Sequence, residues 1–196
     1  MANRTAKIER KTKETQIELE LNLDGEGRYE IGTGNGFFDH MLSHLARHGL
    51  MDLILKGQGD LHVDAHHTVE DVAICLGQAL EQALADKKGI TRFGWAAVPM
   101  EDSLAQVAID ISGRPGLVFN ATFNAEKIGD FDVELVAEFM RGFSNNAKLN
   151  LHVIVPYGTN NHHIAEAIFK ALGRSLAQAV GRDTRVKDVP STKGVL

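Results

Sequence analysis

The chain has 196 residues, of which 43% are hydrophobic, and it carries a formal net charge of −5. A chain of this length and composition can bury a core of its own, which excludes an intrinsically disordered protein. Its basic residues are scattered and form no stripe, so we expect no nucleic-acid partner. No apolar run approaches the roughly 20 residues of a membrane helix, and residues 1–13 lack a signal-peptide pattern. We therefore expect a cytoplasmic protein with no membrane partner.

Histidine is the residue type that stands out, with nine copies gathered in a few short segments. The single cysteine, Cys75, cannot form an internal disulfide and lies in an apolar helical run over residues 72–84, so we expect it in the core. The clustered histidines are therefore the main chemical signal in the sequence.

Hydrophobic periodicity predicts strands and helices in both halves of the chain. Apolar and polar residues alternate from Thr15 to Leu23, which is the period of a half-buried strand. In the first half we predict strands at 15–23, 50–56 and 61–63 and helices at 37–49 and 68–85. In the second half we predict strands at 95–98, 103–111, 117–123 and 149–155 and helices at 132–145 and 164–180. This order of elements predicts an α+β fold.

The two halves share a sequence repeat with an offset of 96 residues. The matching residues are His66, His67, Glu70, Leu76, Gly77, Leu80, Gln82 and Ala83 in one copy and His162, His163, Glu166, Leu172, Gly173, Leu176, Gln178 and Ala179 in the other. Any two amphipathic helices can share apolar positions, but a His-His pair and a Glu in one register indicate an internal duplication. We therefore predict two pseudo-equivalent halves, residues 1–93 and 94–196, in one compact domain.

The repeated motif has the spacing of a metal site. Positions i and i+4 of a helix share one face, so His66 and Glu70 can offer an imidazole and a carboxylate to one ion, as can their counterparts in the second copy. His67 and His163 point about 100° away from that face, so we expect them to serve a different ion. Imidazole and carboxylate suit Mn, Fe, Co, Ni or Zn. The competing interpretation, a His pair that only caps a helix, is disfavoured by two copies in register.

Four ligands for each ion require two further histidines. His40 opens a predicted helix after the glycine-rich turn, and His152 lies in a predicted strand, where it could equally be a core histidine. His44 and His48 share a helix face with His40, so they could support the ligands, face a substrate or be solvated. We expect His62 at the surface.

Several segments follow a distinctive pattern, namely residues 36–42 (GFFDHML), 63–72 (VDAHHTVEDV), 92–94 (RFG), 112–115 (SGRP), 158–170 (GTNNHHIAEAIFK) and 191–193 (STK). Through them the chain resembles the imidazoleglycerol-phosphate dehydratase family of histidine biosynthesis over nearly its whole length. The resemblance implies an α+β fold made of a duplicated unit, each a four-stranded sheet packed with two helices. It also leads us to expect one catalytic domain without the fused phosphatase of some bacterial members.

The resemblance further implies two manganese ions in each active site. The ligands of one ion would be His40, His67, His162 and Glu166, and those of the other His66, Glu70, His152 and His163. Family members look like assemblies of 24 subunits with active sites at subunit contacts. We therefore expect this chain to self-associate in the same way, with ligands shared between neighbouring chains.

The reaction implied is the dehydration of imidazole glycerol phosphate, a small phosphorylated imidazole, to imidazole acetol phosphate. The resemblance points to Glu14 as the base that removes a carbon-bound proton. Lys170 lies four residues after Glu166 on the same helix face, so we expect it as the second catalytic residue, which could orient the substrate. The forked guanidinium group of arginine suits phosphate, and Arg92 and Arg114 stand beside glycines. The implied substrate-binding residues are Glu14, His48, Arg92, Arg114, Lys170, Ser191 and Lys193. From the residues alone, Glu14 and Lys170 could be solvated charges and the C-terminal tail could be frayed.

Two other functions fit part of the pattern. A dinuclear hydrolase would use its ions to activate water, but such sites usually contain a bridging carboxylate, whereas here each ion receives its own Glu. A metal-storage protein would explain the histidines but not the phosphate-type residues or Glu14. A nucleotide-binding loop at residues 32–36 is disfavoured, because no Gly-Lys-Ser/Thr ending follows.

Overall fold

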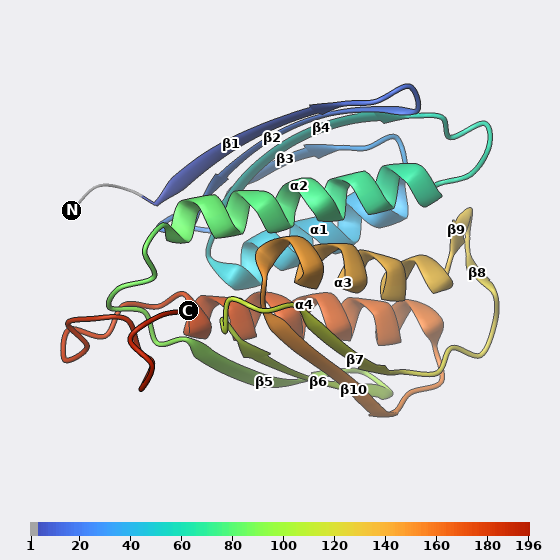
Figure 1. Ribbon diagram of the computed structural model, residues 1–196. Helices are drawn as coiled ribbons and strands as arrows, with labels where there is room; N and C mark the ends of the chain where they lie inside the picture. The colour runs from blue at the N-terminus through green and yellow to red at the C-terminus, as the bar shows by residue number, and fades with distance from the viewer. Residues whose placement is uncertain (1–3) are drawn as a thin grey trace.

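The computed structural model describes residues 4–196, and it consists of two similar halves (Figure 1). The first half contains β1 (Thr5–Lys11), β2 (Thr15–Asn22), β3 (Tyr29–Gly32), α1 (Gly36–Gly49), β4 (Asp52–Gly59) and α2 (His66–Leu84). The second half contains β5 (Phe93–Met100), β6 (Ser103–Asp110), β7 (Gly116–Asn120), β8 (Lys127–Ile128), β9 (Phe131–Asp132), α3 (Glu134–Ala147), β10 (Asn150–Tyr157) and α4 (Asn161–Ala179). The predicted α+β fold with two similar halves is confirmed.

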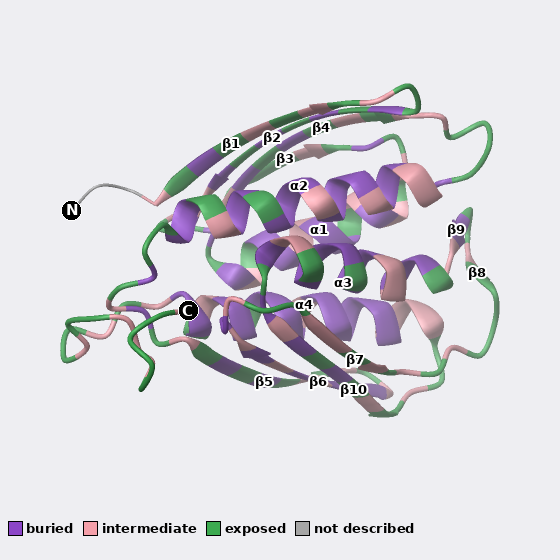
Figure 2. Cartoon of the chain, in the orientation of Figure 1, coloured by how far each residue is buried: buried purple, intermediate pink, exposed green. Residues whose placement is uncertain are grey.

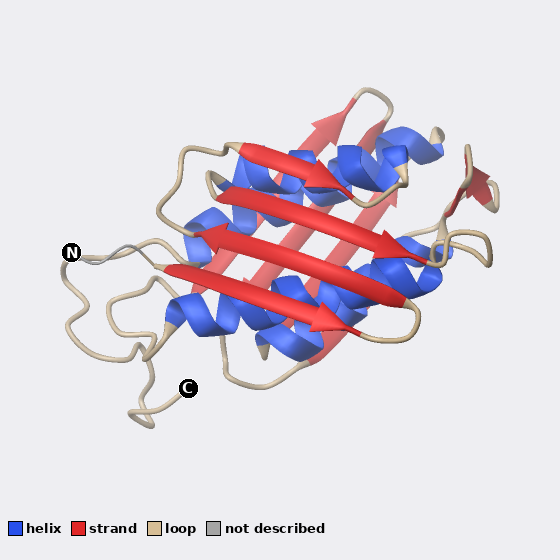
Figure 3. Cartoon of the chain, turned by 90° about the horizontal axis from the view of Figure 1, so that it is seen from above, coloured by secondary structure: helices blue, strands red, loops and turns tan. Residues whose placement is uncertain are grey.

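The helices occupy the inside of the molecule, and a four-stranded sheet covers them on each side (Figure 1). The strand orders, β1-β2-β4-β3 and β5-β6-β10-β7, are equivalent, and in both sheets the last pair is parallel. Helices α1 and α2 pack on the first sheet, and α3 and α4 pack on the second. Between the sheets, α2 packs on α3 and α1 packs on α4. Seen from above, the strands of one sheet run across those of the other (Figure 3).

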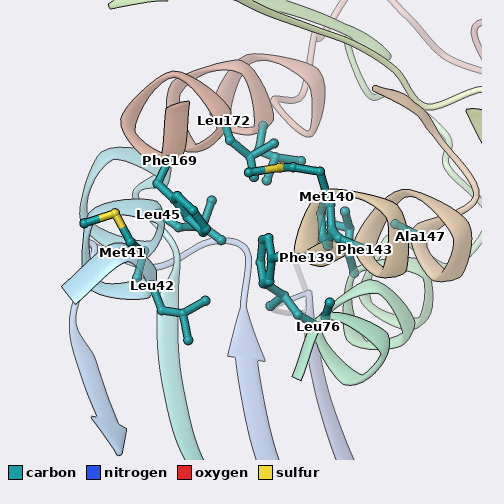
Figure 4. Close-up of a cluster of buried hydrophobic side chains, with 14 of the residues drawn as sticks. Met41, Leu42, Leu45, Leu76, Phe139, Met140, Phe143, Ala147, Phe169 and Leu172 are labelled. Carbon is teal, nitrogen blue, oxygen red and sulfur yellow. The ribbon is translucent and has the colours of Figure 1, made fainter. Parts of the chain in front are cut away.

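The core lies where the helices meet, as the buried inner faces in Figure 2 show. Phe139 and Phe143 of α3 point towards Leu45 of α1 and Leu76 of α2, and all four are almost fully buried (Figure 4). Each such side chain contributes roughly 1.5–3 kcal/mol through burial. Cys75 is also buried, as predicted, and burial raises the pKa of its thiol to about 11. None of the helices in residues 4–196 combines the length and hydropathy needed to cross a membrane.

Two equivalent glycines let the helices approach closely and define how the halves correspond. A Cβ atom added at Gly77 would lie 2.8 Å from the Phe143 carbonyl oxygen, and one added at Gly173 would lie 2.7 Å from the Leu45 carbonyl oxygen. Leu45 on α1 therefore corresponds to Phe143 on α3, an offset of 98, whereas α2 and α4 correspond with an offset of 96. The difference arises because the loop after β10 is shorter than the loop after β4.

One prediction of secondary structure was wrong, and several short or edge strands were not predicted. Residues 61–63, predicted as a strand, form a turn in which the Val63 N–H donates to the Asp60 carbonyl at 2.8 Å, because β4 continues to Gly59 instead. Strand β1 was not predicted: it is an edge strand whose outward residues are charged, such as Lys7 paired with Glu20 at 3.4 Å. Strand β3 and the short β8–β9 hairpin were also missed. The other predicted elements are confirmed, with shifts at their ends.

Arg4 joins the N-terminal strand to the end of α4. Its Nη2 donates to Asp24 at 2.6 Å and its Nη1 donates to the Val180 carbonyl at 2.5 Å. The hydrogen bond from the guanidinium is the main cause of a lowered pKa of Asp24. This cluster therefore ties the first half to the second.

We expect Asp24→Asn to lower the free energy of unfolding by about 1 kcal/mol or less at pH 7, because the pair is partly exposed. The folded pKa of Asp24 lies below its unfolded value, so the unfolded state takes up the proton first. The stabilisation is therefore present above the ordinary carboxyl pKa and is lost as pH falls through the lowered folded pKa. Chemical unfolding of both proteins from pH 7 downwards should show the difference shrinking. A constant difference would exclude the carboxylate charge as its cause.

Candidate functional site

One cluster of side chains that could hold a metal ion forms where α1 packs on α4. Donor atoms of His40, on α1, and of His162 and Glu166, on α4, all lie within 4.8 Å of one another. Glu166 Oε2 lies 3.1 Å from His162 Nε2 and 3.5 Å from His40 Nε2. The two halves thus bring together three of the four residues predicted to bind the first ion.

The local structure at the start of α4 places its histidines. Asn160 accepts hydrogen bonds from the backbone N–H groups of His162 at 2.9 Å and His163 at 3.3 Å, which satisfies donors that the helix leaves unpaired. Its repeat counterpart, Asp64, accepts from the backbone N–H of His66 at 2.7 Å. The same type of turn therefore precedes both copies of the motif.

Glu166 is a nearly buried carboxylate, with a side chain 7% exposed. Burial is the largest influence on its pKa and opposes ionisation. The Lys170 ammonium, 2.6 Å from Oε1, together with the charges of His44 and His40 outweighs burial, so the pKa falls to about 2. Glu166 is therefore an anion at neutral pH, with Oε1 held by Lys170 and Oε2 facing two imidazoles.

His44 stands beside the same cluster. Its Nε2 lies 3.2 Å from His40 Nε2 and 3.3 Å from Glu166 Oε1. Burial is the main cause that lowers its pKa to about 4, so its imidazole is neutral at physiological pH. His48 stacks on His44 one turn further along α1, with ring centroids 5.8 Å apart, and burial lowers its pKa as well. Helical spacing predicted that His40, His44 and His48 share a face of α1. Only the packing of α4 shows that this face meets Glu166.

The first copy of the motif, on α2, is not completed within one chain. Helix α3 packs on α2 as α1 packs on α4, but the α3 positions that correspond to His40 and His44 are Glu138 and Gly142. No imidazole therefore faces the motif on α2 from α3. In the described residues no three of the residues predicted for the second ion form such a donor group; they are His66, Glu70, His152 and His163.

The second histidine of each motif is held by a carboxylate. His67 Nδ1 lies 3.0 Å from Asp60, and His163 Nδ1 lies 2.6 Å from Asp102. A carboxylate on Nδ1 is the usual outer partner of a metal-binding histidine, because it leaves Nε2 free to bind the ion. Neither Asp60 nor Asp102 is among the predicted site residues: Asp102 could be interpreted as an outer acid at the start of a strand, whereas no spacing links Asp60 to the motifs.

Comparison with known proteins shows the family of this chain. Residues 33–176 match the family described as imidazoleglycerol-phosphate dehydratase. The chain belongs to this family. It is 57% identical, over the full length of both chains, to the imidazoleglycerol-phosphate dehydratase of Clostridium botulinum strain Hall, and 58% identical over 98% of this chain and 99% of the relative to that of Geobacillus kaustophilus.

Solved structures of the imidazoleglycerol-phosphate dehydratase family share the fold. The crystal structure from Staphylococcus aureus N315 has a TM-score of 0.83 and 40% identity, and covers 91% of this chain and 99% of that one. The structure from Pyrococcus furiosus, in complex with (S)-C348, has a TM-score of 0.84 and 36% identity, over 96% and 100%. The family name denotes a dehydratase, so this chain belongs to a family of hydro-lyases.

Glu14 lies in the turn between β1 and β2, at the end of the molecule where α2 begins. Its backbone N–H donates to Thr12 Oγ1 at 3.1 Å, and its side chain is exposed. The next residue, Thr15, donates to the buried Asp71, which fixes the turn on α2. The hydrogen bond with Asp60 is the main cause that raises the pKa of His67, and the charge of Glu14 adds to it. Glu14 and His67 therefore lie at one corner.

The residues predicted to bind phosphate lie at the opposite end of α4 from the metal cluster. The Arg92 N–H donates to the carbonyl of Ala179, the last residue of α4, at 2.9 Å, whereas His162 lies in its first turn. At 1.5 Å per residue, the helix between them is about 25 Å long. One chain therefore does not place Arg92 beside its own metal cluster.

These arginines already have partners within the chain. The Arg92 guanidinium bonds both carboxylate oxygens of Asp110, at 2.7 and 3.1 Å, and the Pro190 carbonyl at 2.9 Å. Arg114 is exposed and donates to the Ser112 carbonyl at 3.0 Å. In the tail, Ser191 is half-buried and Lys193 is exposed. Arg92 and the C-terminal tail therefore lie together at one end of the molecule.

His152 lies on the outer face of the second sheet, in an apolar row. Its cross-strand neighbours in that row are Trp95, Ala108 and Val118. The equivalent row of the first sheet is Lys7, Glu20, Ile54 and Glu30, so the counterpart of His152 is Ile54. Trp95 is 58% exposed and Val118 46% exposed. One outer sheet face is therefore charged, and the other is apolar around a histidine.

We expect Glu166→Gln to weaken manganese binding roughly 100-fold or more, because even outer partners of ligands contribute 10–100-fold to metal affinity. Glu138→Gln on α3 is the matched control, since it removes a helical glutamate outside the cluster. Isothermal titration of metal-stripped protein measures both. Equal affinities of the two variants would contradict a role for Glu166 as a ligand.

Proposed function

We propose that this chain is a manganese-dependent dehydratase that converts imidazole glycerol phosphate to imidazole acetol phosphate in histidine biosynthesis. The observation that carries the proposal is the cluster of His40, His162 and Glu166, which the two halves build together. Membership of the family and the relatives' names supply the substrate and the pathway.

The donor set fits a divalent transition metal. Two imidazoles and an ionised, nearly buried carboxylate place three donors around one point, and His44 adds a neutral imidazole beside them. We propose His40, His67, His162 and Glu166 as ligands of one manganese ion, and His66, Glu70, His152 and His163 as ligands of the other. When bound, the ions would stabilise the imidazolate form of the substrate's ring, whose electrons favour loss of the hydroxyl on the carbon attached to it.

The chain's own residues then handle protons and orientation. We propose that Glu14, exposed and set in a turn fixed on α2, removes the carbon-bound proton. Lys170 is held by Glu166 and is 18% exposed, which suits an ammonium that orients the leaving hydroxyl. Loss of the proton and the hydroxide yields an enol, which becomes the ketone of the product. His48, on the same face of α1 as His40, would contact the substrate.

We propose that the active site is shared between chains. Arg92, Arg114, Ser191 and Lys193 would bind the phosphate, yet Arg92 lies about 25 Å along α4 from the metal cluster, too far for one small substrate. Within residues 4–196 no imidazole joins the motif on α2 in such a donor group, and His152 lies on an exposed face. A neighbouring copy of the chain would supply phosphate-binding residues to the metal cluster and imidazole ligands to the motif on α2.

The apolar row around His152 supports self-association. A covered sheet face would bury Trp95 and Val118 and would present His152 to another chain. We propose the 24-subunit assembly expected from the family resemblance, in a cytoplasmic enzyme. Within each chain we propose residues 1–93 and 94–196 as the two halves of one catalytic domain.

The reaction is tested by turnover of imidazole glycerol phosphate with metal-stripped protein, with and without added manganese. We expect product only with manganese, and we expect Glu14→Gln to lower kcat about 10²–10⁴-fold, as loss of a general base does. Metal analysis of Glu14→Gln should show the manganese content of the unaltered protein. No product from folded, metal-loaded protein would overturn the dehydratase proposal. Phosphate release instead would favour a hydrolase.

Shared active sites are tested by coexpression of Glu14→Gln with Arg114→Ala. Each variant alone should be nearly inactive. If the two residues reach one site from different chains, about a quarter of the sites in a random mixture would be intact. Coexpression of Glu14→Gln with Glu14→Ala is the control, because no combination of these chains restores a site. Activity no higher than this control would contradict sharing.

A further inference from the structure

We propose that Asp102 is a positioning residue that orients His163 for metal binding and anchors the loop that starts α4. The inference rests on the two-metal function proposed above. Asp102 Oδ1 lies 2.6 Å from His163 Nδ1. Its Oδ2 accepts from the Thr159 N–H at 2.6 Å, the Thr159 hydroxyl at 2.5 Å and the Asn160 N–H at 2.9 Å. One carboxylate thus connects the β5–β6 turn, the loop before α4 and a predicted ligand.

The backbone on both sides is shaped for this contact. Glu101, in the β5–β6 turn, has a φ of 49°, in the left-handed region that non-glycine residues rarely adopt. A Cβ atom added at Gly158 would lie 2.6 Å from the hydroxyl of Ser103, so only glycine lets the loop approach the turn this closely. Both features bring Asp102 to the loop before α4, and the sequence keeps them despite their conformational cost.

Asp102 also acts on the start of helix α4 through Asn160. Asn160, whose N–H donates to Asp102, caps α4 by accepting from the N–H groups of His162 and His163. Asp102 therefore acts on His163 twice, through the imidazole and through the helix cap. These hydrogen bonds also hold the pKa of Asp102 well below its usual range, so the carboxylate remains an anion.

The first half shows that this arrangement is not a general property of the fold. Strands β2 and β6 correspond with an offset of 88, because Thr15 and Ser103 are the buried first residues of each. The residue before each is Glu14 in one half and Asp102 in the other. Glu14 is exposed, and Asp60 contacts His67 in its place. The duplicated position therefore carries a free carboxylate in one half and a fully bonded one in the other.

The chemistry of imidazole explains what the contact does. A carboxylate at Nδ1 keeps the proton on that nitrogen, so the lone pair of Nε2 is available to a metal ion. It also stops the ring from rotating at a helix start, where the side chain would otherwise be partly exposed. Outer partners of this kind typically contribute 10–100-fold to metal affinity.

The test compares Asp102→Asn with Asp52→Asn. Asp52 Oδ1 accepts from the N–H groups of Glu26 and Arg28, both at 2.9 Å, so it also closes a loop, but neither of these contacts involves a histidine. Metal-stripped proteins are loaded with manganese and dialysed against a chelator, and the metal retained per chain is measured. Circular dichroism and thermal unfolding show that both variants are folded.

We expect one of the two manganese ions to bind 10–100-fold more weakly in Asp102→Asn, while Asp52→Asn retains both. Asp60→Asn should weaken the other ion, because His67 belongs to the other proposed ligand set. Unaltered affinity for both ions in Asp102→Asn, or an equal loss in Asp52→Asn, would overturn the proposal. The readout needs no turnover, so a protein that binds both ions as proposed but lacks dehydratase activity would refute the function and leave the role of Asp102 standing. A protein that binds no manganese would refute both.

Discussion

The packing of α1 on α4 is the contact on which the rest of the structure depends. Gly173 lets the helices approach until a Cβ atom there would lie 2.7 Å from the Leu45 carbonyl oxygen, and this approach encloses the Glu166 carboxylate. A buried carboxylate is unfavourable unless charges and hydrogen bonds compensate for the loss of water. Lys170 and the imidazoles of α1 provide this compensation. The same contact thus joins the two halves and concentrates metal-binding groups between them.

Duplication gave both halves the same framework, and divergence gave them different chemistry. The strand orders and the glycines at 77 and 173 are equivalent, and Asp64 and Asn160 each accept from the N–H of the first histidine of a motif. The partners of the motif differ, because α1 presents histidines where α3 presents Glu138 and Gly142. A close helix approach at Gly142, where a Cβ atom would lie 2.9 Å from that of Ala73, leaves no room for an imidazole there. The motif on α2 must therefore find its partners outside the helix pair.

The sequence predicts those parts of the structure that depend on local spacing. The His66–Glu70 spacing and its repeat located the metal motifs, and the contact between His162 and Glu166 at 3.1 Å confirms the i, i+4 argument. Alternation located the central strands, whose inner faces are apolar. It failed for the edge strand β1, where only Ala6 is buried, and for β3, which has no buried residue. Asp60 and Asp102 were not among the predicted site residues, because turns bring them to the histidines and no fixed spacing encodes such contacts.

The outer faces of the two sheets differ in chemistry, although their strands are equivalent. Equivalent positions carry Lys7, Glu20, Ile54 and Glu30 on one face and Trp95, Ala108, His152 and Val118 on the other. A charged face is stable in water, whereas a row with Trp95 58% exposed gains free energy when another surface covers it. His152 stands in the middle of that row, so a chain that covers it would bury apolar area and approach a proposed metal ligand in the same step. Under the proposed function, metal binding and self-association would then stabilise each other by mass action, since an ion bound across the contact favours the assembled state alone.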